Sequence, residues 1–432
     1  MIKLKRTIYL FLFILITSCS LSTFIDIDNE RTGGLRISED FNWSISRNRI
    51  ITVRVDSEEN CLVEVYDEDP RGGGELIASG IAGNNLDFKT VINVAEIIES
   101  FIAKCYWTDG KVSYETLLFD ESEYASCNFK SQYASSEELH NLTVNADRDM
   151  DNIPDGFDQY PDDNTKAFRS FSPGKEMWGT LAFEDLWPSM TDFDYNDLIV
   201  YYNFEQITTA ENQVLEIIGR FTFPAVGASF ENAFGIQFDN LDLWHIDSVS
   251  GNILKENTIQ VDGNGLESGQ AKPVVILTDN IENSLHRNND GAMLNTVVGG
   301  GTGWSDTLVV RITLAGPLEV EKLGAAPYNP FIFRDQNRTV EIHLPNDVPT
   351  TLVDHSNFGT FNDGSDPDKG IYYLTEYFVP WVHHFPIRWK WPDESDDIIN
   401  AYPNYGKWAE SDGVESKDWY VNPDPDYEGP WK

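Results

Sequence analysis

The stretch Leu215-Glu-Ile-Ile-Gly-Arg-Phe-Thr-Phe223 places apolar side chains at positions 215, 217, 221 and 223 and polar ones at 216, 220 and 222. Successive side chains of a β-strand point to opposite faces, so this spacing predicts a strand with one face in a core and the other in water. Residues 308–314 and 340–344 repeat the alternation. No long segment keeps the 3.6-residue period of a helix, which predicts antiparallel β structure for most of the chain.

The charge of the chain narrows the classes of function. Its 432 residues include 71 Asp and Glu but 31 Lys and Arg, which gives a formal net charge of −40. Such a surface repels phosphate backbones and excludes nucleic-acid binding. The same repulsion opposes the compact state, so cations that bind only the folded chain are expected to stabilise it. An apolar fraction of 41% and an aromatic fraction of 13% supply enough side chains for substantial cores.

Two β units are expected along the chain. Residues 35–128 contain short alternating strands and predict a small immunoglobulin-like β-sandwich. Residues 129–146 are polar and rich in serine, which is typical of a linker. After an acidic segment at 147–168, residues 169–432 predict a larger antiparallel β-sandwich. The predicted fold class is therefore all-β.

The first residues resemble a bacterial lipoprotein signal. Positive charges at Lys3, Lys5 and Arg6 precede an apolar run at 8–16 that is too short to span a bilayer as a mature helix. The run ends in Ile16-Thr-Ser-Cys19, which is similar to a lipobox. An ordinary secretory signal with a fortuitous cysteine is the alternative.

The lipobox resemblance implies removal of residues 1–18 and acylation of Cys19. Two or three acyl chains, at ~0.8 kcal/mol per buried CH₂, anchor a protein stably to a membrane. Residues 19–34 then form a polar tether. Ser20 follows the cysteine where an Asp would alter sorting, and by analogy with other lipoproteins this favours the outer membrane.

Three further cysteines, Cys61, Cys105 and Cys127, leave two interpretations open. The expected compartment is oxidising, so one disulfide can form among them and leave one thiol over. Alternatively, Cys61 and Cys105 are small buried hydrophobic residues of predicted strands.

The acidic run that begins at Asp147 has the spacing of a calcium-binding loop. In such a loop, side-chain oxygens and one backbone carbonyl surround a single hard cation. The predicted ligands are Asp147, Asp149, Asp151, Ile153 through its carbonyl, Asp155 and Asp158. Asn152 stands where glycine is usual, and asparagine tolerates the positive φ that this position requires. The run resembles the Asp-rich loops of thrombospondin type-three repeats, and a solvated acidic linker is the alternative.

A second group of oxygen-bearing side chains lies at residues 184–197. Acidic residues and Asn196 alternate there with Phe193 and Tyr195, which predicts oxygens on one side and aromatic rings on the other. The predicted ligands of a second calcium site are Glu184, Asp185, Asp192, Asp194, Asn196 and Asp197. Two alternatives are hydrogen bonding of these groups to turn backbone and a pair of carboxylates in a glycan hydrolase.

Histidine and tryptophan residues give weaker signals. His343 lies on the polar face of a predicted strand and is expected to be exposed. The adjacent His383 and His384 point to opposite faces of a strand, which makes them poor joint zinc ligands. Tryptophans are dense near the C-terminus, where they can build a core or, if exposed, stack on sugar rings; we favour the core.

Four separated blocks, at residues 147–168, 179–201, 329–345 and 401–420, look like the LruC-type domain. This domain is common in outer-membrane lipoproteins of Bacteroidetes and also occurs in spirochaetes. The resemblance covers residues 147–432 and implies a lipoprotein with β structure. It implies no reaction, because the family has no established catalytic residues. Asn152 in place of glycine departs from the family pattern.

Taken together, these features predict a calcium-stabilised, non-enzymatic outer-membrane lipoprotein with a role in binding or adhesion. Its expected contacts are the membrane, through the lipid anchor, and a glycan, matrix protein or other envelope protein. A glycan-binding module of a nutrient-uptake system is the first alternative, and a carboxylate-based glycan hydrolase is the second.

Overall fold

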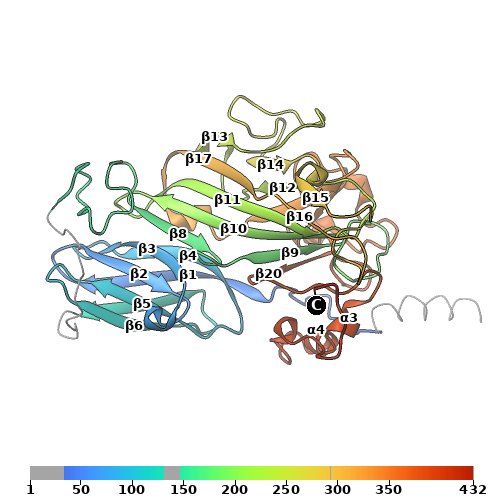
Figure 1. Cartoon of the computed structure of the whole chain (residues 1–432), viewed down its shortest axis with the longest axis horizontal. Coiled ribbons are helices and arrows are strands. Elements are labelled where there is room, and N and C mark those ends of the chain that lie inside the picture. Colours follow the sequence, from blue (N-terminus) through green and yellow to red (C-terminus); the bar gives the residue numbers. More distant parts are fainter. Residues whose placement is uncertain (1–33, 131–145, 292, 432) are drawn as a thin grey trace, which may run out of the picture.

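The computed structural model describes residues 34–130, 146–291 and 293–431 (Figure 1). The predicted signal peptide, the acylated Cys19 and most of the predicted linker lie outside these residues. The N-terminal strands are β1 (Ser46–Asp56), β2 (Cys61–Tyr66), β3 (Leu76–Ala82), β4 (Phe88–Ala95), β5 (Ser100–Tyr106), β6 (Val112–Leu118) and β7 (Tyr124–Lys130). The short 3₁₀ turn η1 (Pro70–Gly72) connects β2 and β3.

The remaining strands are β8 (Phe168–Ser172), β9 (Gly179–Phe183), β10 (Leu198–Thr208), β11 (Val214–Ala225), β12 (Asn232–Gln237), β13 (Ile246–Ser250), β14 (Val274–Thr278), β15 (Leu285–Arg287), β16 (Gly303–Ser305), β17 (Leu308–Leu318), β18 (Asn329–Arg334), β19 (Glu341–His343) and β20 (Val382–Phe385). The helices are short: α2 (Val320–Leu323), α3 (Ile398–Ala401) and α4 (Tyr405–Glu410). The 3₁₀ turns are η3 (Leu243–His245), η4 (Ile281–Ser284), η5 (His355–Asn357), η6 (Pro367–Lys369) and η7 (Trp419–Val421). The prediction of an all-β protein is confirmed.

The N-terminal strands form two layers around one core. The sheet β4-β1-β7 is one layer, and the run β3-β2-β5-β6 is the other. Alternate residues such as Ile51, Val53, Val63 and Val65 meet between the layers and are fully buried. Cys61 and Cys105 are buried in this core as free thiols, and Cys127 is a free, partly buried thiol. The structure therefore agrees with the second interpretation, in which Cys61 and Cys105 are buried hydrophobic residues and form no disulfide.

The two β units share one continuous sheet. Its order is β13-β17-β11-β10-β8-β3-β2-β5-β6, and Ala78 of β3 pairs with Ser170 of β8 at the junction. Figure 1 shows the blue N-terminal strands beside the green strand β8. Strand β10 is central because its first half pairs with β9 and its second half pairs with β8. Strand β9 in turn pairs with β20 near the end of the chain.

A second sheet, in the order β14-β12-β18-β19, covers one face of β9, β10, β11 and β17. Phe234 of β12 shows how the layers meet, because its ring packs 6.3 Å from that of Phe183 and 5.6 Å from that of Phe221. The predicted inward residues of β17 belong to this core, as do Ile217, Phe221 and Phe223 of β11. The prediction was wrong for Leu215, because a register shift between Val214 and Glu216 turns Val214 inward in its place. Edge-to-face contacts between the rings add to the area that the layers bury.

The C-terminal residues form an aromatic lobe on the other face of β9 and β20, together with the chain's first described segment. The buried rings of the lobe include Phe41, Trp43, Phe385, Trp389, Tyr402, Tyr405, Trp408 and Trp419. Trp43 lies within 5.7 Å of Tyr405 and 5.6 Å of Trp408, and its Nε1 donates to the carbonyl of Phe378 at 2.7 Å. The dense C-terminal tryptophans thus build a core, and residues 35–45 join that core although they precede the N-terminal sandwich.

We predict that Trp43→Ala lowers the free energy of unfolding by about 3–5 kcal/mol, because it leaves a cavity in the lobe and removes the hydrogen bond from Trp43 to the carbonyl of Phe378. Urea unfolding followed by tryptophan fluorescence measures the change. Trp244→Ala is the matched control: Trp244 is 70% exposed, and its loss is expected to cost no more than about 0.5 kcal/mol. Equal losses of stability for Trp43→Ala and Trp244→Ala would contradict this role of Trp43 in anchoring residues 35–45 to the lobe.

Candidate metal centres

The acidic loop closes on itself through its own backbone. Asp147 accepts hydrogen bonds from the backbone N of Met150 at 2.8 Å and of Asn152 at 3.1 Å. Met150 and Asn152 have φ values of 66° and 74°, the left-handed conformation that turns the chain sharply. As a result, carboxylate oxygens of Asp147, Asp149 and Asp151 lie within 4.8 Å of one another. The positive φ predicted for Asn152 is confirmed.

Several oxygens of this loop are buried without a hydrogen-bond partner. They are both carboxylate oxygens of Asp149 and one each of Asp151 and Asp158. Burial, reinforced by neighbouring carboxylates, raises the pKa of Asp158 to about 7 and also raises the pKa of Asp151. A buried charge without a partner is costly, and Ca²⁺ is bound by six to eight oxygens of this kind. The donor set therefore fits a calcium ion.

Two of the predicted ligands need separate comment. Asp155 accepts hydrogen bonds from Arg148, from its backbone N at 2.9 Å and from its Nε at 3.0 Å. This pairing holds the Asp155 carboxylate in place and helps to close the loop, and ligation by Asp155 stays a prediction. The side chain of Ile153 is buried against Phe157 and Phe168, which anchors the loop to the protein, and ligation by its carbonyl stays a prediction.

The second cluster forms where β9 ends and β10 begins. Phe183 pairs with Leu198, so Glu184 and Asp185 leave the sheet beside the residues that enter it. The connecting loop alternates as predicted, because Phe193 and Tyr195 are buried in the aromatic lobe. Both aromatic residues have positive φ, 62° and 53°, a conformation that bulky side chains rarely adopt. Backbone strain of this kind accumulates at ligand-binding sites.

Glu184, Asp192 and Asp194 are brought together in this cluster. Their carboxylate oxygens lie within 4.8 Å of one another, and Glu184 and Asp194 are 0% and 1% exposed. Glu184 accepts from the backbone N of Tyr195 at 2.6 Å and from the hydroxyl of Thr191, and Asp194 accepts from the backbone N of Ser395 at 2.6 Å. The other oxygen of Asp194 accepts from the backbone N of Asn196 at 3.1 Å, so each of the four oxygens accepts one hydrogen bond and keeps a second lone pair for a cation.

The electrostatics of the cluster follow from burial of like charges. Burial raises the pKa of Glu184, Asp185 and Asp194 well above their usual values, and nearby carboxylates add to the effect. Burial also raises the pKa of Asp197 to about 6, although the backbone N of Asp185 donates to it at 2.8 Å. The guanidinium of Arg334 donates to the carbonyl oxygen of Asp185, so the lone cation beside the cluster does not neutralise a carboxylate directly.

Sequence reasoning missed two acidic residues that face this cluster. Glu394 and Asp397 each carry a buried carboxylate oxygen without a partner. Burial raises the pKa of both groups to about 7, and Asp192 contributes to each shift. The sequence did contain a signal, the acidic run at 393–397, but it lies about 200 residues from the loop at 184–197. No ligand spacing joins segments so far apart.

Comparison with known proteins adds a matching family model for part of the chain and a similar fold. Residues 212–420 match the family described as Domain of unknown function (DUF4842), a range that includes β11 to β20 and most of the aromatic lobe. The crystal structure of a candidate lipoprotein from Bacteroides ovatus is similar to this chain, with a TM-score of 0.56 and 18% identity over 85% of this chain and 98% of that one. At this identity the likeness shows a shared fold. No curated protein matches the chain.

The family description carries no LruC name, so the LruC-type resemblance stays a prediction. None of the helices in the described ranges is long and apolar enough to cross a membrane.

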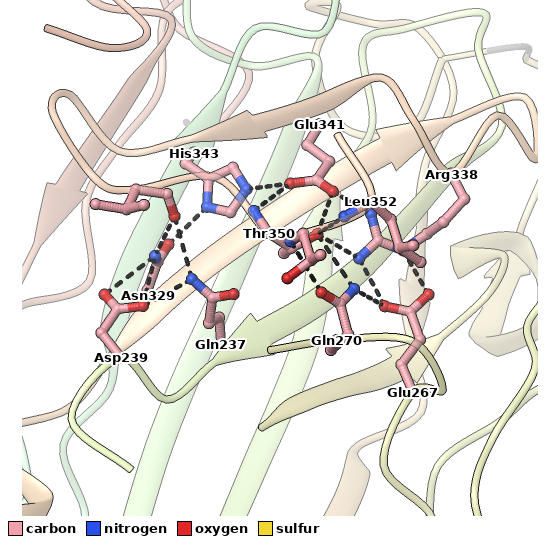
Figure 2. Close-up of polar contacts among 12 residues, drawn as sticks. Gln237, Asp239, Glu267, Gln270, Asn329, Arg338, Glu341, His343, Thr350 and Leu352 are labelled. Atoms are coloured by element: carbon pink, nitrogen blue, oxygen red, sulfur yellow. Dashed lines mark hydrogen bonds and ion pairs between the residues drawn. The ribbon is translucent and has the colours of Figure 1, made fainter. Parts of the chain in front are cut away.

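A third polar cluster lies on the four-stranded sheet and is paired internally (Figure 2). Arg338 donates two hydrogen bonds of 2.6 Å to Glu267 and one of 2.5 Å to Glu341. His343 lies 2.9 Å from Glu341 and 2.6 Å from the side-chain oxygen of Asn329. Burial alone would raise the pKa of Glu341, but hydrogen bonds from His343 and the charge of Arg338 lower it to about 2. Because these groups satisfy one another, the cluster is a structural ion network.

This network corrects the expectation that His343 is exposed. Its exposed fraction is 0%, as is that of Glu341, so both faces of β19 are buried. Arg338 and Thr350 cover the face that the alternation assigned to water.

The adjacent His383 and His384 point to different partners, as predicted. His383 lies 3.1 Å from the hydroxyl of Tyr405, and His384 lies 2.6 Å from the hydroxyl of Tyr202.

We predict that Arg338→Met lowers the free energy of unfolding by about 3–5 kcal/mol, because it leaves Glu267 and Glu341 buried without their positive partner. Chemical denaturation in excess calcium measures the loss. Lys89→Met removes the exposed ion pair with Glu321 and is expected to cost at most about 1 kcal/mol. A loss for Arg338→Met no larger than that of the control would contradict the network's structural role.

Proposed function

We propose that this chain is a calcium-stabilised, non-enzymatic lipoprotein of the outer membrane that presents its β units for binding or adhesion. One observation carries the proposal: both carboxylate oxygens of Asp149 and one each of Asp151 and Asp158 are buried without a hydrogen-bond partner among the described residues. Calcium satisfies such a set without any change of fold. The lipobox-like segment ending at Cys19 would supply the anchor, and a glycan, matrix protein or envelope protein would be the partner.

Burial of the second cluster favours a structural role over hydrolysis. A glycosidase places two carboxyl groups on either side of the scissile bond, so both must reach a sugar chain. Glu184 and Asp194 are almost entirely covered, by Thr191, Tyr195 and the segment that contains Ser395. A small cation fits among such groups, whereas a polysaccharide does not. This arrangement supports the non-enzymatic reading.

We predict that calcium raises the melting temperature of residues 20–432 after the protein has been stripped with a chelator. A ligand at 100 times its Kd stabilises a folded protein by about 2.7 kcal/mol per site. Asp149→Asn combined with Asp151→Asn should remove part of this gain, because the loop loses two ligands while the second cluster keeps its own. Differential scanning calorimetry with and without calcium measures both effects.

The control for this experiment is Asp247→Asn combined with Asp290→Asn, which makes the same change of net charge at two exposed positions. This variant should keep the full gain. A melting temperature of the original chain that ignores both calcium and chelator would refute calcium stabilisation. If the loop variant keeps the full rise in melting temperature, the acidic loop is not one of the calcium sites.

Glycan binding is a second candidate, favoured by one exposed face of the β15–β16 hairpin. His286 pairs with Trp304, and just beyond the strands the backbone N of Asn288 donates to the carbonyl of Thr302 at 2.8 Å. These four side chains are exposed, whereas Leu285, Arg287, Gly303 and Ser305 are half-buried on the other face. Trp304 is 55% exposed and its ring stacks on His286, with centroids 5.2 Å apart. A fixed indole beside amide and hydroxyl groups suits the apolar face and hydroxyls of a sugar ring.

We predict that any glycan bound by the chain loses about tenfold in affinity on Trp304→Ala, which corresponds to about 1.4 kcal/mol of stacking. A glycan array followed by calorimetry on the best ligand tests this. Trp244→Ala, at another exposed tryptophan, should leave affinity unchanged. An array without saturable binding would reject the glycan candidate, and a loss confined to Trp244→Ala would reject this hairpin as its site.

A further inference from the structure

Two further oxygens, outside the Glu184–Asp192–Asp194 group, converge beside Gly227. Asn196 is 0% exposed and its side-chain oxygen has no partner, although its amide nitrogen donates to the carbonyl of Pro392 at 3.2 Å. One oxygen of Glu394 is also buried without a partner. Both approach Gly227, where a Cβ atom would lie 2.2 Å from the Asn196 oxygen and 2.6 Å from the Glu394 oxygen. Glycine at position 227 allows these oxygens to converge, because any larger side chain would collide with them.

The charge around these oxygens exceeds what one cation can neutralise. Seven carboxylates interact here, and among the described residues the guanidinium of Arg334 lies beside them. The seven are Glu184, Asp185, Asp192, Asp194, Asp197, Glu394 and Asp397. With all of them ionised, one divalent cation would leave most of the excess negative charge in place, whereas two would remove most of it. Buried charges that are neither paired nor bound to metal are very costly.

We propose that this cluster holds two divalent cations, the first among Glu184, Asp192 and Asp194 and the second between Asn196 and Glu394. Asp192 lies beside both positions, because it belongs to the first group and also interacts with Glu394. Carboxylate and amide oxygens are the ligands that calcium takes in proteins, so calcium is the expected cation at both. The inference rests on the proposed calcium function and extends it to a site completed by the C-terminal segment.

The second ion would fasten the aromatic lobe to the β9–β10 loop. The segment that carries Glu394 already contacts this loop, since Ser395 N donates to Asp194 at 2.6 Å and Ile398 N donates to the carbonyl of Phe193 at 2.9 Å. Asp397 then caps α3 through the backbone N of Ile399. A cation held by Glu394 therefore joins two segments about 200 residues apart at the start of the lobe.

Counting bound calcium tests the inference. Residues 20–432 are stripped with chelator, titrated with calcium by calorimetry, and analysed for bound metal after gel filtration. We expect three ions in the original chain, one in the acidic loop and two in the cluster. Glu394→Gln should bind two, the variant with Asp149→Asn and Asp151→Asn should bind a different two, and Glu415→Gln, a change at an exposed glutamate of the same lobe, should bind three.

The melting temperature of the metal-free protein shows whether Glu394 is a cation ligand or a structural residue. Glu394→Gln removes one of the crowded carboxylates, so the stripped variant should melt at the same temperature as the stripped original chain or higher, while gaining less from calcium. Glu394→Asp keeps the charge on a shorter side chain and should bind the third ion more weakly. These two readouts keep the test decisive if either variant is altered in folding.

The outcomes distinguish this inference from the function on which it rests. Two ions in the original chain, with Glu394→Gln unchanged, would overturn the second ion of the cluster and leave calcium stabilisation in place. Binding of no calcium would overturn both. A stripped Glu394→Gln that is much less stable than the stripped original chain would make Glu394 a structural residue and would also overturn the inference.

Discussion

Buried negative charge between β9 and β10 is the constraint on which the C-terminal half of this fold depends. Glu184 and Asp194 are almost completely buried, and their oxygens lie within 4.8 Å of each other and of Asp192. Two like charges 4 Å apart repel by about 4 kcal/mol at an effective dielectric constant of about 20. The whole stability of a domain is about 5–15 kcal/mol. Repulsion within this one cluster is therefore comparable with the free energy that holds a domain together, and a bound cation removes it without protonating the carboxylates.

Strand β10 explains why the two β units behave as one structure. It reaches β9 with its first half and β8 with its second, and β8 meets β3 at Ala78 and Ser170. Further polar contacts cross the same junction: Asn212, in the turn before β11, exchanges two hydrogen bonds of 2.9 Å with the backbone of Ile81. At the opposite end, Trp43 inserts into the aromatic lobe. The N-terminal unit is thus held to the larger one both by a shared sheet and by a segment that wraps beneath it.

Sequence patterns predict features that depend on neighbouring residues and miss contacts between residues that are far apart in the chain. Alternation identified β11 and β17 because one face of each strand packs on a core, and the aspartate spacing identified three carboxylates that converge in the acidic loop. The same rule failed at His343, because a polar strand face is exposed only when nothing charged covers it, and Arg338 covers this one. Glu394 was missed for a different reason: its approach to Asn196 depends on the path of about 200 intervening residues. Asp155 has the spacing of a ligand and also pairs with Arg148, a contact that the spacing alone does not predict.

The candidate cation sites lie where segments distant in the sequence must be joined. The acidic loop sits against Leu62 and Ile81 of the N-terminal unit, and Gln159, which follows the loop, donates to Ser79 of β3 at 2.9 Å. The second cluster joins the β9–β10 loop to the C-terminal segment through Asp194 and Ser395. In a chain with a net charge of −40, such junctions gather carboxylates that repel when brought together. A divalent cation bound between two such segments neutralises the repulsion and joins the segments. The same bound ion therefore offsets the high negative charge and stabilises the contact between segments that are distant in the sequence.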